Sequence, residues 1–119
     1  MPKALPVIDM TAPVCCAPVA AGPMSDADAL QVALRLKALA DPARVKIVSQ
    51  LFSSVAGEES SGGLAAVLGL SESTVSHHLG QLRKAGIVVS QRRGMNVFHQ
   101  VRPDALQALC AVLDPACCR

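Results

Sequence analysis

Residues 71–86 read SESTVSHHLGQLRKAG, and this stretch has the pattern of a single amphipathic helix. Ser71 is a favourable N-cap and Gly86 a favourable stop. Since a helix turns by ~100° per residue, Val75, Leu79 and Leu82 share one face, which we expect to be buried. The opposite face is small and polar at first and cationic later, with Ser73, His77, Gly80 and Lys84 in a row and Ser76 beside them.

Two adjacent histidines in this stretch could hold a metal, transfer protons or contact a nucleic acid. Metal ligands on a helix prefer an i, i+4 spacing, and no carboxylate stands close by in sequence to orient a catalytic base. His77 falls on the exposed row, where short polar groups followed by cations suit a DNA major groove. His78 lies only ~60° from the apolar stripe. We therefore predict that His78 packs at the edge of the core and bonds a backbone group.

Positive charge is concentrated around this helix. Between Glu72 and Asp104 the sequence has no carboxylate but has Arg83, Lys84, Arg92, Arg93 and Arg102. Such a local excess is typical of a phosphate-binding surface, although a merely solvated basic face is the alternative.

The flanking sequence predicts a winged helix-turn-helix, mostly α with a β-hairpin wing. Ser25 with Asp28 has the form of a capping box, and Asp41–Pro42 opens a second helix. The core stripe expected of this second helix is Val45, Ile47, Val48, Leu51 and Phe52. We expect a loop at AGEESSGG (residues 56–63), then a short helix at Leu64–Leu68. A hairpin around Gly94 follows, and a last helix from Pro103 to Pro115 with an apolar stripe of Leu106, Leu109, Cys110 and Leu113.

This pattern divides the chain into three parts. Residues 1–24 contain five of the eight prolines and are predicted to form a flexible arm. Residues 25–114 form the DNA-binding and dimerisation domain, and residues 115–119 form a tail. No apolar run reaches the ~20 residues of a membrane span, and prolines interrupt any signal-peptide core. We expect a soluble cytoplasmic protein.

The five cysteines, Cys15, Cys16, Cys110, Cys117 and Cys118, lie near the two ends of the chain. An odd number argues against a disulfide framework. Neighbouring cysteines have Cα atoms ~3.8 Å apart, below the usual ~4.4 Å limit for a relaxed disulfide. The two vicinal pairs are therefore better chelators than disulfides, whereas Cys110 on an apolar stripe could simply pack.

Three segments resemble the ArsR/SmtB family of bacterial metal-responsive repressors. They are KALADPARVKIVSQL, LGLSESTVSHHLGQLRKAGIV and RRGMNVFHQVRP, which together span roughly residues 36–103. The resemblance implies a homodimer joined through its N- and C-terminal helices, which binds double-stranded operator DNA and releases it when a metal or metalloid binds. Glu72 departs from the glutamine that relatives often carry. The predicted DNA-binding residues are Ser73, Thr74, Ser76, His77, Lys84, Arg92 and Arg93.

The family's metal sites vary, and two common ones are missing here. The segment GGLAAVL lacks a Cys-x-Cys motif, and PDALQALCAVLD lacks histidine. What remains is ligation by thiolates, which suits soft ions. The segment PVCCAP resembles arsenite-responsive actinobacterial members, although the third cysteine that they carry after the second helix is absent from FSSVAGEESSGG. We predict arsenite or antimonite as the inducer, with cadmium or lead as the alternative.

The ligand set is open between two arrangements. Either Cys15 and Cys16 act with Cys110 or a tail cysteine, or Cys110, Cys117 and Cys118 act together. A thiol-redox switch is a rival function. A metal-sequestering protein or a thiol enzyme is another, but no nucleophile–base pair is visible in the sequence, and we predict that the protein is not an enzyme.

Overall fold

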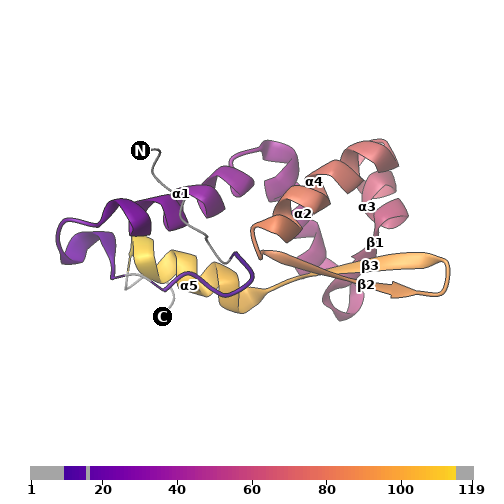
Figure 1. Ribbon diagram of the computed structural model, residues 1–119. Coiled ribbons are helices and arrows are strands. Elements are labelled where there is room, and N and C mark those ends of the chain that lie inside the picture. Colours follow the sequence, from indigo (N-terminus) through magenta and orange to yellow (C-terminus); the bar gives the residue numbers. More distant parts are fainter. Residues whose placement is uncertain (1–9, 16, 115–119) are drawn as a thin grey trace, which may run out of the picture.

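The computed structural model describes residues 10–15 and 17–114 as helices packed on a small antiparallel sheet (Figure 1). The elements in chain order are η1 Val19–Ala21, α1 Asp26–Leu39, α2 Pro42–Ser53, η2 Val55–Gly57, β1 Glu58–Ser60, α3 Ser61–Leu68, α4 Glu72–Lys84, β2 Val88–Arg93, β3 Asn96–Val101 and α5 Pro103–Leu113. The predicted winged helix, mostly helical with a β-hairpin, is confirmed. None of the helices in the described part of the chain is long and apolar enough to cross a membrane.

Side-chain caps start the helices where the sequence predicts them. Ser25 Oγ accepts a hydrogen bond from the Asp28 amide at 3.1 Å, and Asp41 Oδ1 accepts one from the Ala43 amide at 2.8 Å. At α4, Ser71 Oγ accepts from the Thr74 amide at 3.2 Å. Each cap satisfies an amide that has no partner within its helix, which fixes the register of the apolar face that follows.

The sheet has the strand order β1-β3-β2, so the hairpin gains a third strand. The prediction of a loop at residues 56–63 is wrong, because Glu59 pairs with His99 in β1 and α3 begins at Ser61 rather than at Leu64. A three-residue strand is too short to show a period, and two glycines weaken the helical signal. The strand β1 is stabilised by its hydrogen bonds to β3 rather than by the strand propensity of its own residues.

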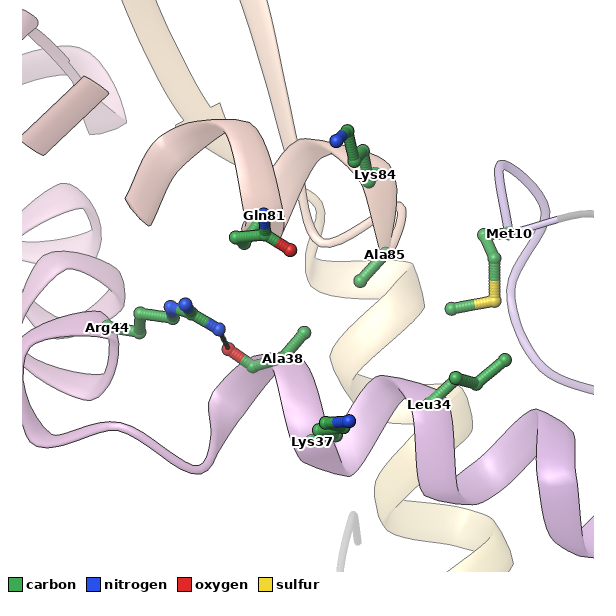
Figure 2. A pocket seen from close by; sticks show the side chains of 8 residues that line it. All are labelled: Met10, Leu34, Lys37, Ala38, Arg44, Gln81, Lys84 and Ala85. Atoms are coloured by element: carbon green, nitrogen blue, oxygen red, sulfur yellow. Dashed lines mark hydrogen bonds between the residues drawn. The ribbon is translucent and has the colours of Figure 1, made fainter. Parts of the chain in front are cut away.

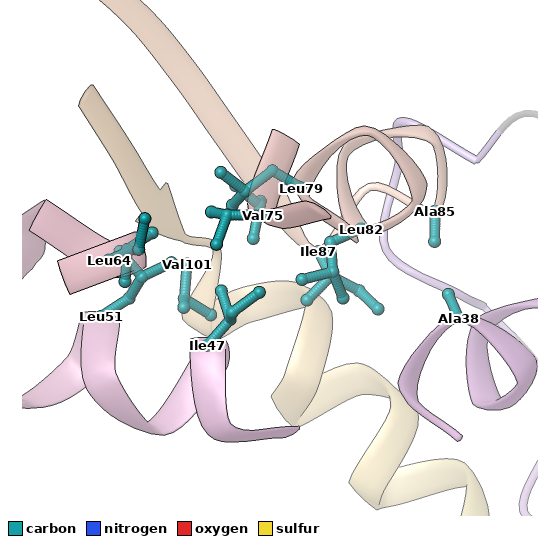
Figure 3. Close-up of a cluster of buried hydrophobic side chains, with 12 residues drawn as sticks. Ala38, Ile47, Leu51, Leu64, Val75, Leu79, Leu82, Ala85, Ile87 and Val101 are labelled. Carbon is teal, nitrogen blue, oxygen red and sulfur yellow. The ribbon is translucent and has the colours of Figure 1, made fainter. Parts of the chain in front are cut away.

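The main core lies between α2, α3, α4 and the sheet (Figure 3). Val75, Leu79 and Leu82 of α4 are buried, as predicted. On α2 the stripe is narrower than expected, because Val45 and Phe52 are 54% and 53% exposed. The helix packs against the core along one edge, through the fully buried side chains Ile47 and Leu51, with Val48 half-buried beside them.

A second hydrophobic cluster joins the N-terminal segment to α1 and α5. It consists of Val14, Val32, Leu109 and Val112. Arg35 donates a hydrogen bond to the Ala12 carbonyl at 3.0 Å, and Arg102 donates to the Thr11 carbonyl. Residues 10–14 are thus packed on the helices.

The predicted stripe of α5 is wrong in its register. The buried residues of α5 are Ala105, Leu109 and Val112, whereas Leu106 and Cys110 are half-buried and Leu113 is 44% exposed. Residues 105, 109 and 112 follow the i, i+4, i+7 spacing of one helical face, and Leu109 and Val112 on it meet Val14 and Val32. The sequence of α5 is apolar on more than one face, so only its neighbours decide which face is buried.

Candidate nucleic-acid interface and cysteine sites

The polar face of α4 is exposed to solvent. Ser73, Thr74, Ser76 and His77 are all exposed in its first two turns, and Lys84 is exposed at its end. The Ser71 hydroxyl donates to Thr74 Oγ1 at 2.8 Å, so the Thr74 hydroxyl also belongs to the cap. The helix therefore presents short hydrogen-bonding groups at its N-terminal end and positive charge at its C-terminal end.

His78 has a side-chain partner instead of the predicted backbone partner. It is half-buried at the edge of the core, as expected, and its Nδ1 accepts a hydrogen bond from Arg44 Nε at 3.0 Å. Arg44 also donates to the Ala38 carbonyl at 3.3 Å. His78 thereby connects α4 to the start of α2 and the end of α1. Arg44 lies 34 residues away in sequence, which is why periodicity within α4 did not reveal it.

The positive surface of the wing is divided between the two faces of the sheet. Arg83 Nη1 of α4 donates to Ser90 Oγ of β2 at 3.1 Å, so the Ser90 side chain faces α4. Side chains alternate along a strand, and Arg92 therefore lies on this same face. Lys84 and Arg92 form no ion pair with any residue in the described ranges.

Arg93 lies on the other face of the sheet and is paired. Its Nη1 and Nη2 donate to the two carboxylate oxygens of Glu58 at 2.5 and 2.7 Å, and its guanidinium lies 5.0 Å from the centre of the Phe98 ring. This hydrogen-bonded contact lowers the pKa of Glu58 and raises the pKa of Arg93. Arg102 is paired too, with Asp104 at 3.1 Å.

The segment without carboxylates is therefore partly neutralised in the folded protein, because carboxylates pair with two of its five cations. Strand β1 brings Glu58 to the wing, and Asp104 folds back onto Arg102. Three members of the predicted cationic group, Arg83, Lys84 and Arg92, are exposed and form no ion pair within the described residues.

His99 is a buried polar residue to which the sequence pattern assigns no role beyond its position in the basic interval. It is 2% exposed, with Nε2 at 2.7 Å from Ser61 Oγ and Nδ1 at 2.6 Å from Ser90 Oγ. Burial, and then the charge of Arg83, lower its pKa from the usual 6.5. The sequence showed no serine–histidine pair, and the fold creates this one. An imidazole so enclosed is placed to hold structure rather than to meet a substrate.

A pocket of about 420 Å³ adjoins the C-terminal end of α4 (Figure 2). Its lining residues are Met10, Leu34, Lys37, Ala38, Arg44, Gln81, Lys84 and Ala85. Figure 2 shows them coming from α1, α4, the start of α2 and the N-terminal segment. Three of these side chains are cationic and none is acidic, so the pocket extends the positive surface from α4 toward α1.

The cysteines divide into described and undescribed ones. Cys15 is exposed and its thiol is free, whereas Cys110 is half-buried on α5 and disulfide-bonded. Cys16, Cys117 and Cys118 lie outside the described residues. Within the part of the chain that the structure describes, no three histidine, cysteine or acidic side chains are close enough to hold a metal ion. Val14 and Leu109 share one hydrophobic cluster, and each is the sequence neighbour of a cysteine.

The fold agrees with comparisons to known proteins. Residues 41–90 match a family described as bacterial regulatory protein, arsR family. The HTH-type transcriptional regulator YgaV of Escherichia coli strain K12 is 35% identical over 92 residues, covering 77% of this chain and 91% of that protein. This chain belongs to the ArsR family of bacterial transcriptional regulators. It is a helix-turn-helix, DNA-binding regulator rather than an enzyme.

Two further similar proteins have names that refer to metalloids. The arsenic resistance transcriptional regulator ArsR1 of Pseudomonas putida is 36% identical over 77 residues, or 65% of this chain and 59% of that protein. The crystal structure of the antimony-specific transcriptional repressor AntR has a TM-score of 0.61 and 28% identity, and covers 71% of this chain and 76% of that one.

Proposed function

We propose that this ArsR-family regulator is a repressor that is released from operator DNA when trivalent arsenic or antimony binds its thiolates. The observation that carries the proposal is the exposed, free thiol of Cys15, one half of a vicinal pair. Val14, directly before it, packs with Leu109 on α5. The names of two relatives, an arsenic resistance regulator and an antimony-specific repressor, support the choice of ion.

The DNA interface of this proposal is centred on the exposed face of α4. Ser73, Ser76 and His77 would contact base edges in the major groove. Thr74 and Lys84 would lie at the flanking phosphates. Arg92 would bind the backbone next to the groove from the α4 side of the wing, and Arg93 would join it where phosphate competes with Glu58 for its guanidinium.

The functional unit of this proposal is a homodimer formed through α1 and α5. Leu30, Leu36 and Leu113 are large apolar side chains on these helices with 38%, 37% and 44% of their surface exposed. Their burial against a second copy would provide hydrophobic stabilisation. A two-fold dimer would also place two α4 helices on two operator half-sites.

The chemistry of the inducer follows from its ligands. Arsenite is As(OH)₃, and three thiols replace its three hydroxyls, so three As–S bonds form and three waters leave. The vicinal pair Cys15 and Cys16 would supply two thiolates. Cys110 or a tail cysteine would supply the third. Because Cys110 is disulfide-bonded in the structure, a cellular thiol must first reduce that bond by two electrons.

The states of Cys15 and Cys110 also favour a second candidate function, a thiol-redox switch. In the structure Cys110 is disulfide-bonded and the Cys15 thiol is free. In this second reading, oxidation rather than a bound metalloid would change DNA affinity. Cadmium or lead would be alternative soft ions for the same thiolates.

Binding to the DNA upstream of the protein's own gene tests these candidates. The reduced protein is titrated with arsenite, antimonite, cadmium, lead and hydrogen peroxide in separate gel-shift series. The proposal expects release with arsenite or antimonite at concentrations near that of the protein. Release by peroxide alone would establish the redox switch, and release by cadmium or lead alone would replace the metalloid as the inducer.

A further inference from the structure

A chain of hydrogen bonds connects the recognition helix, the wing and α3 through His99. Arg83 Nη1 on α4 donates to Ser90 Oγ on β2 at 3.1 Å. Ser90 Oγ lies 2.6 Å from His99 Nδ1 on β3, and His99 Nε2 lies 2.7 Å from Ser61 Oγ at the start of α3. One imidazole thus bridges two serines on different elements.

The position of His99 within the fold makes this bridge rigid. Its side chain is 2% exposed, and Ser90, His99 and Glu59 occupy one cross-strand row of the sheet. No buried side-chain nitrogen or oxygen in the described residues lacks a partner. A substitution that removes the ring nitrogens would leave the Ser61 hydroxyl without this partner, which is costly in a half-buried place.

This bridge lies between the two parts of the candidate DNA interface. Arg92 follows Ser90 by two residues on the same face of β2, so anything that fixes Ser90 also fixes where Arg92 points. Arg83 belongs to α4, whose exposed polar residues begin directly after the cap Ser71. The bridge therefore connects α4 to the strand that carries Arg92.

We propose that His99 is a positioning residue for operator binding, which holds the wing against α4 by bonding Ser90 and Ser61 at the same time. The proposal rests on the DNA interface proposed above. A wing fixed in place lets Arg92 and α4 bind the same stretch of DNA with little loss of conformational freedom. A loose wing would still attract phosphates, so operator preference should fall more than affinity for random DNA.

Burial next to the positive charge of Arg83 favours a neutral imidazole in this bridge. With Ser90 Oγ accepting from Arg83, the Ser90 hydroxyl can donate to Nδ1, and Nε2–H can donate to Ser61. A proton on Nδ1 would remove that acceptor and place a second positive charge beside Arg83. Around the ring, α4 contributes the charged group Arg83, β1 contributes Glu59 as the cross-strand neighbour, and β2 and α3 contribute the uncharged serines. Acid should therefore weaken operator binding.

The test compares His99→Leu, His99→Asn and His99→Gln in the full-length protein without inducer. Fluorescence anisotropy gives the affinity for operator and for random DNA, and thermal melting monitored by circular dichroism reports folding. Leucine removes both hydrogen bonds and should weaken operator binding about tenfold, with less than a threefold effect on random DNA. Asparagine has a polar group near the Nδ1 position and should restore much of the loss through Ser90. Glutamine, whose amide lies near Nε2, should restore less.

A pH series from 5.5 to 7.5 provides a second measurement. The affinity of the wild-type protein for its operator should fall on acidification, and part of this fall should be absent in His99→Asn. Both proteins contain His77 and His78, so the difference between the two pH curves cancels the contributions of these residues. If wild type prefers its operator but all three variants bind with wild-type preference and the same pH curve, the positioning role is wrong. An equal loss on both DNAs would also overturn it. If wild type shows no preference for the operator, the DNA interface itself fails, and this inference fails with it.

Discussion

At the scale of single residues, partners from distant segments decide what the basic interval can do. The sequence places Arg93 beside Arg92 and gives no reason to distinguish them. In the structure Arg92 lies on the α4 face of the sheet, while Arg93 is held by both carboxylate oxygens of Glu58 on the opposite face. The partner that distinguishes Arg93 comes from β1, a strand too short for the sequence pattern to indicate.

Neutralising Glu58 tests whether the pair restrains Arg93. Glu58→Gln should raise affinity for random DNA about two- to threefold and steepen the log–log salt dependence by roughly one phosphate contact. The matched control is Asp26→Asn, which makes the same change in net charge at the first turn of α1, where that carboxylate lies outside the proposed interface. Equal effects of the two variants would mean that net charge alone matters.

The exposed row of α4 should separate base reading from phosphate binding. Ser76→Ala and His77→Ala should weaken operator binding more than random-DNA binding, by about tenfold in preference for a lost base contact. Arg92→Ala should weaken both by similar factors. Competition titrations with operator and random duplexes measure the two affinities. Equal losses on the two DNAs for His77→Ala would remove this residue from base reading.

Burial of His99 also makes folding sensitive to pH. Its pKa in the folded protein is lowered from the usual 6.5. In the pH range between the folded and the unfolded pKa, the unfolded chain therefore binds more protons than the folded protein. The free energy of unfolding should therefore fall as pH decreases from 7.5 to 5.5. Urea denaturation across this range measures it, and His99→Asn should give a flatter curve. A wild-type curve without this fall, or one identical to that of the variant, would contradict the account.

At the scale of elements, local sequence signals predict where the helices begin more reliably than they predict which helix faces are buried. Caps at Ser25, Asp41 and Ser71 are readable because a hydroxyl or carboxylate bonds an amide two or three residues on. The sequence does not indicate which face of α5 is buried, because apolar residues surround the helix. The packing of Val14 and Val32 beside Leu109, from segments far away in sequence, selects one face.

Two glycines in or next to α4 should respond oppositely to alanine. Gly86 has φ +73°, and a Cβ there would meet the Met10 carbonyl, so Gly86→Ala should lower the free energy of unfolding by at least ~1–2 kcal/mol. Gly80 lies inside α4, and its nearest neighbour to an added Cβ is Arg83 Nη2 at 3.9 Å. Gly80→Ala should therefore stabilise the protein by ~0.5–1 kcal/mol. Urea denaturation of both variants measures the contrast. A neutral Gly86→Ala would show that this junction is not constrained.

At the scale of the whole molecule, the N-terminal segment joins the cysteine region to the DNA-binding region. Thr11 accepts from Arg102 at the junction of β3 and α5, Ala12 accepts from Arg35 on α1, and Cys15 follows three residues later. The family, the winged fold and the exposed face of α4 could be predicted from the sequence because they depend on contiguous patterns. The ligand set could not, because it depends on which distant cysteines the fold brings together.

The proton balance of induction distinguishes the two kinds of soft ion. Arsenite takes up the thiol protons as water, whereas cadmium releases them into solvent. Release of DNA by cadmium should therefore require less metal as pH rises from 6 to 8, and release by arsenite should change less. Anisotropy titrations at fixed salt measure both. A steep pH dependence for the effective inducer would favour the divalent ion.

The most direct test of the central claim is arsenite-induced release of operator DNA by two double variants. Cys15→Ser/Cys16→Ser and Cys117→Ser/Cys118→Ser are compared with wild type, all reduced, by anisotropy with a labelled operator. The account predicts that all three bind DNA equally before arsenite is added. It predicts that wild type releases DNA on titration with arsenite while the N-terminal variant stays bound. The C-terminal variant should also release DNA where Cys110 supplies the third thiolate. Release by the N-terminal variant at wild-type arsenite concentrations, with none by the C-terminal variant, would contradict it.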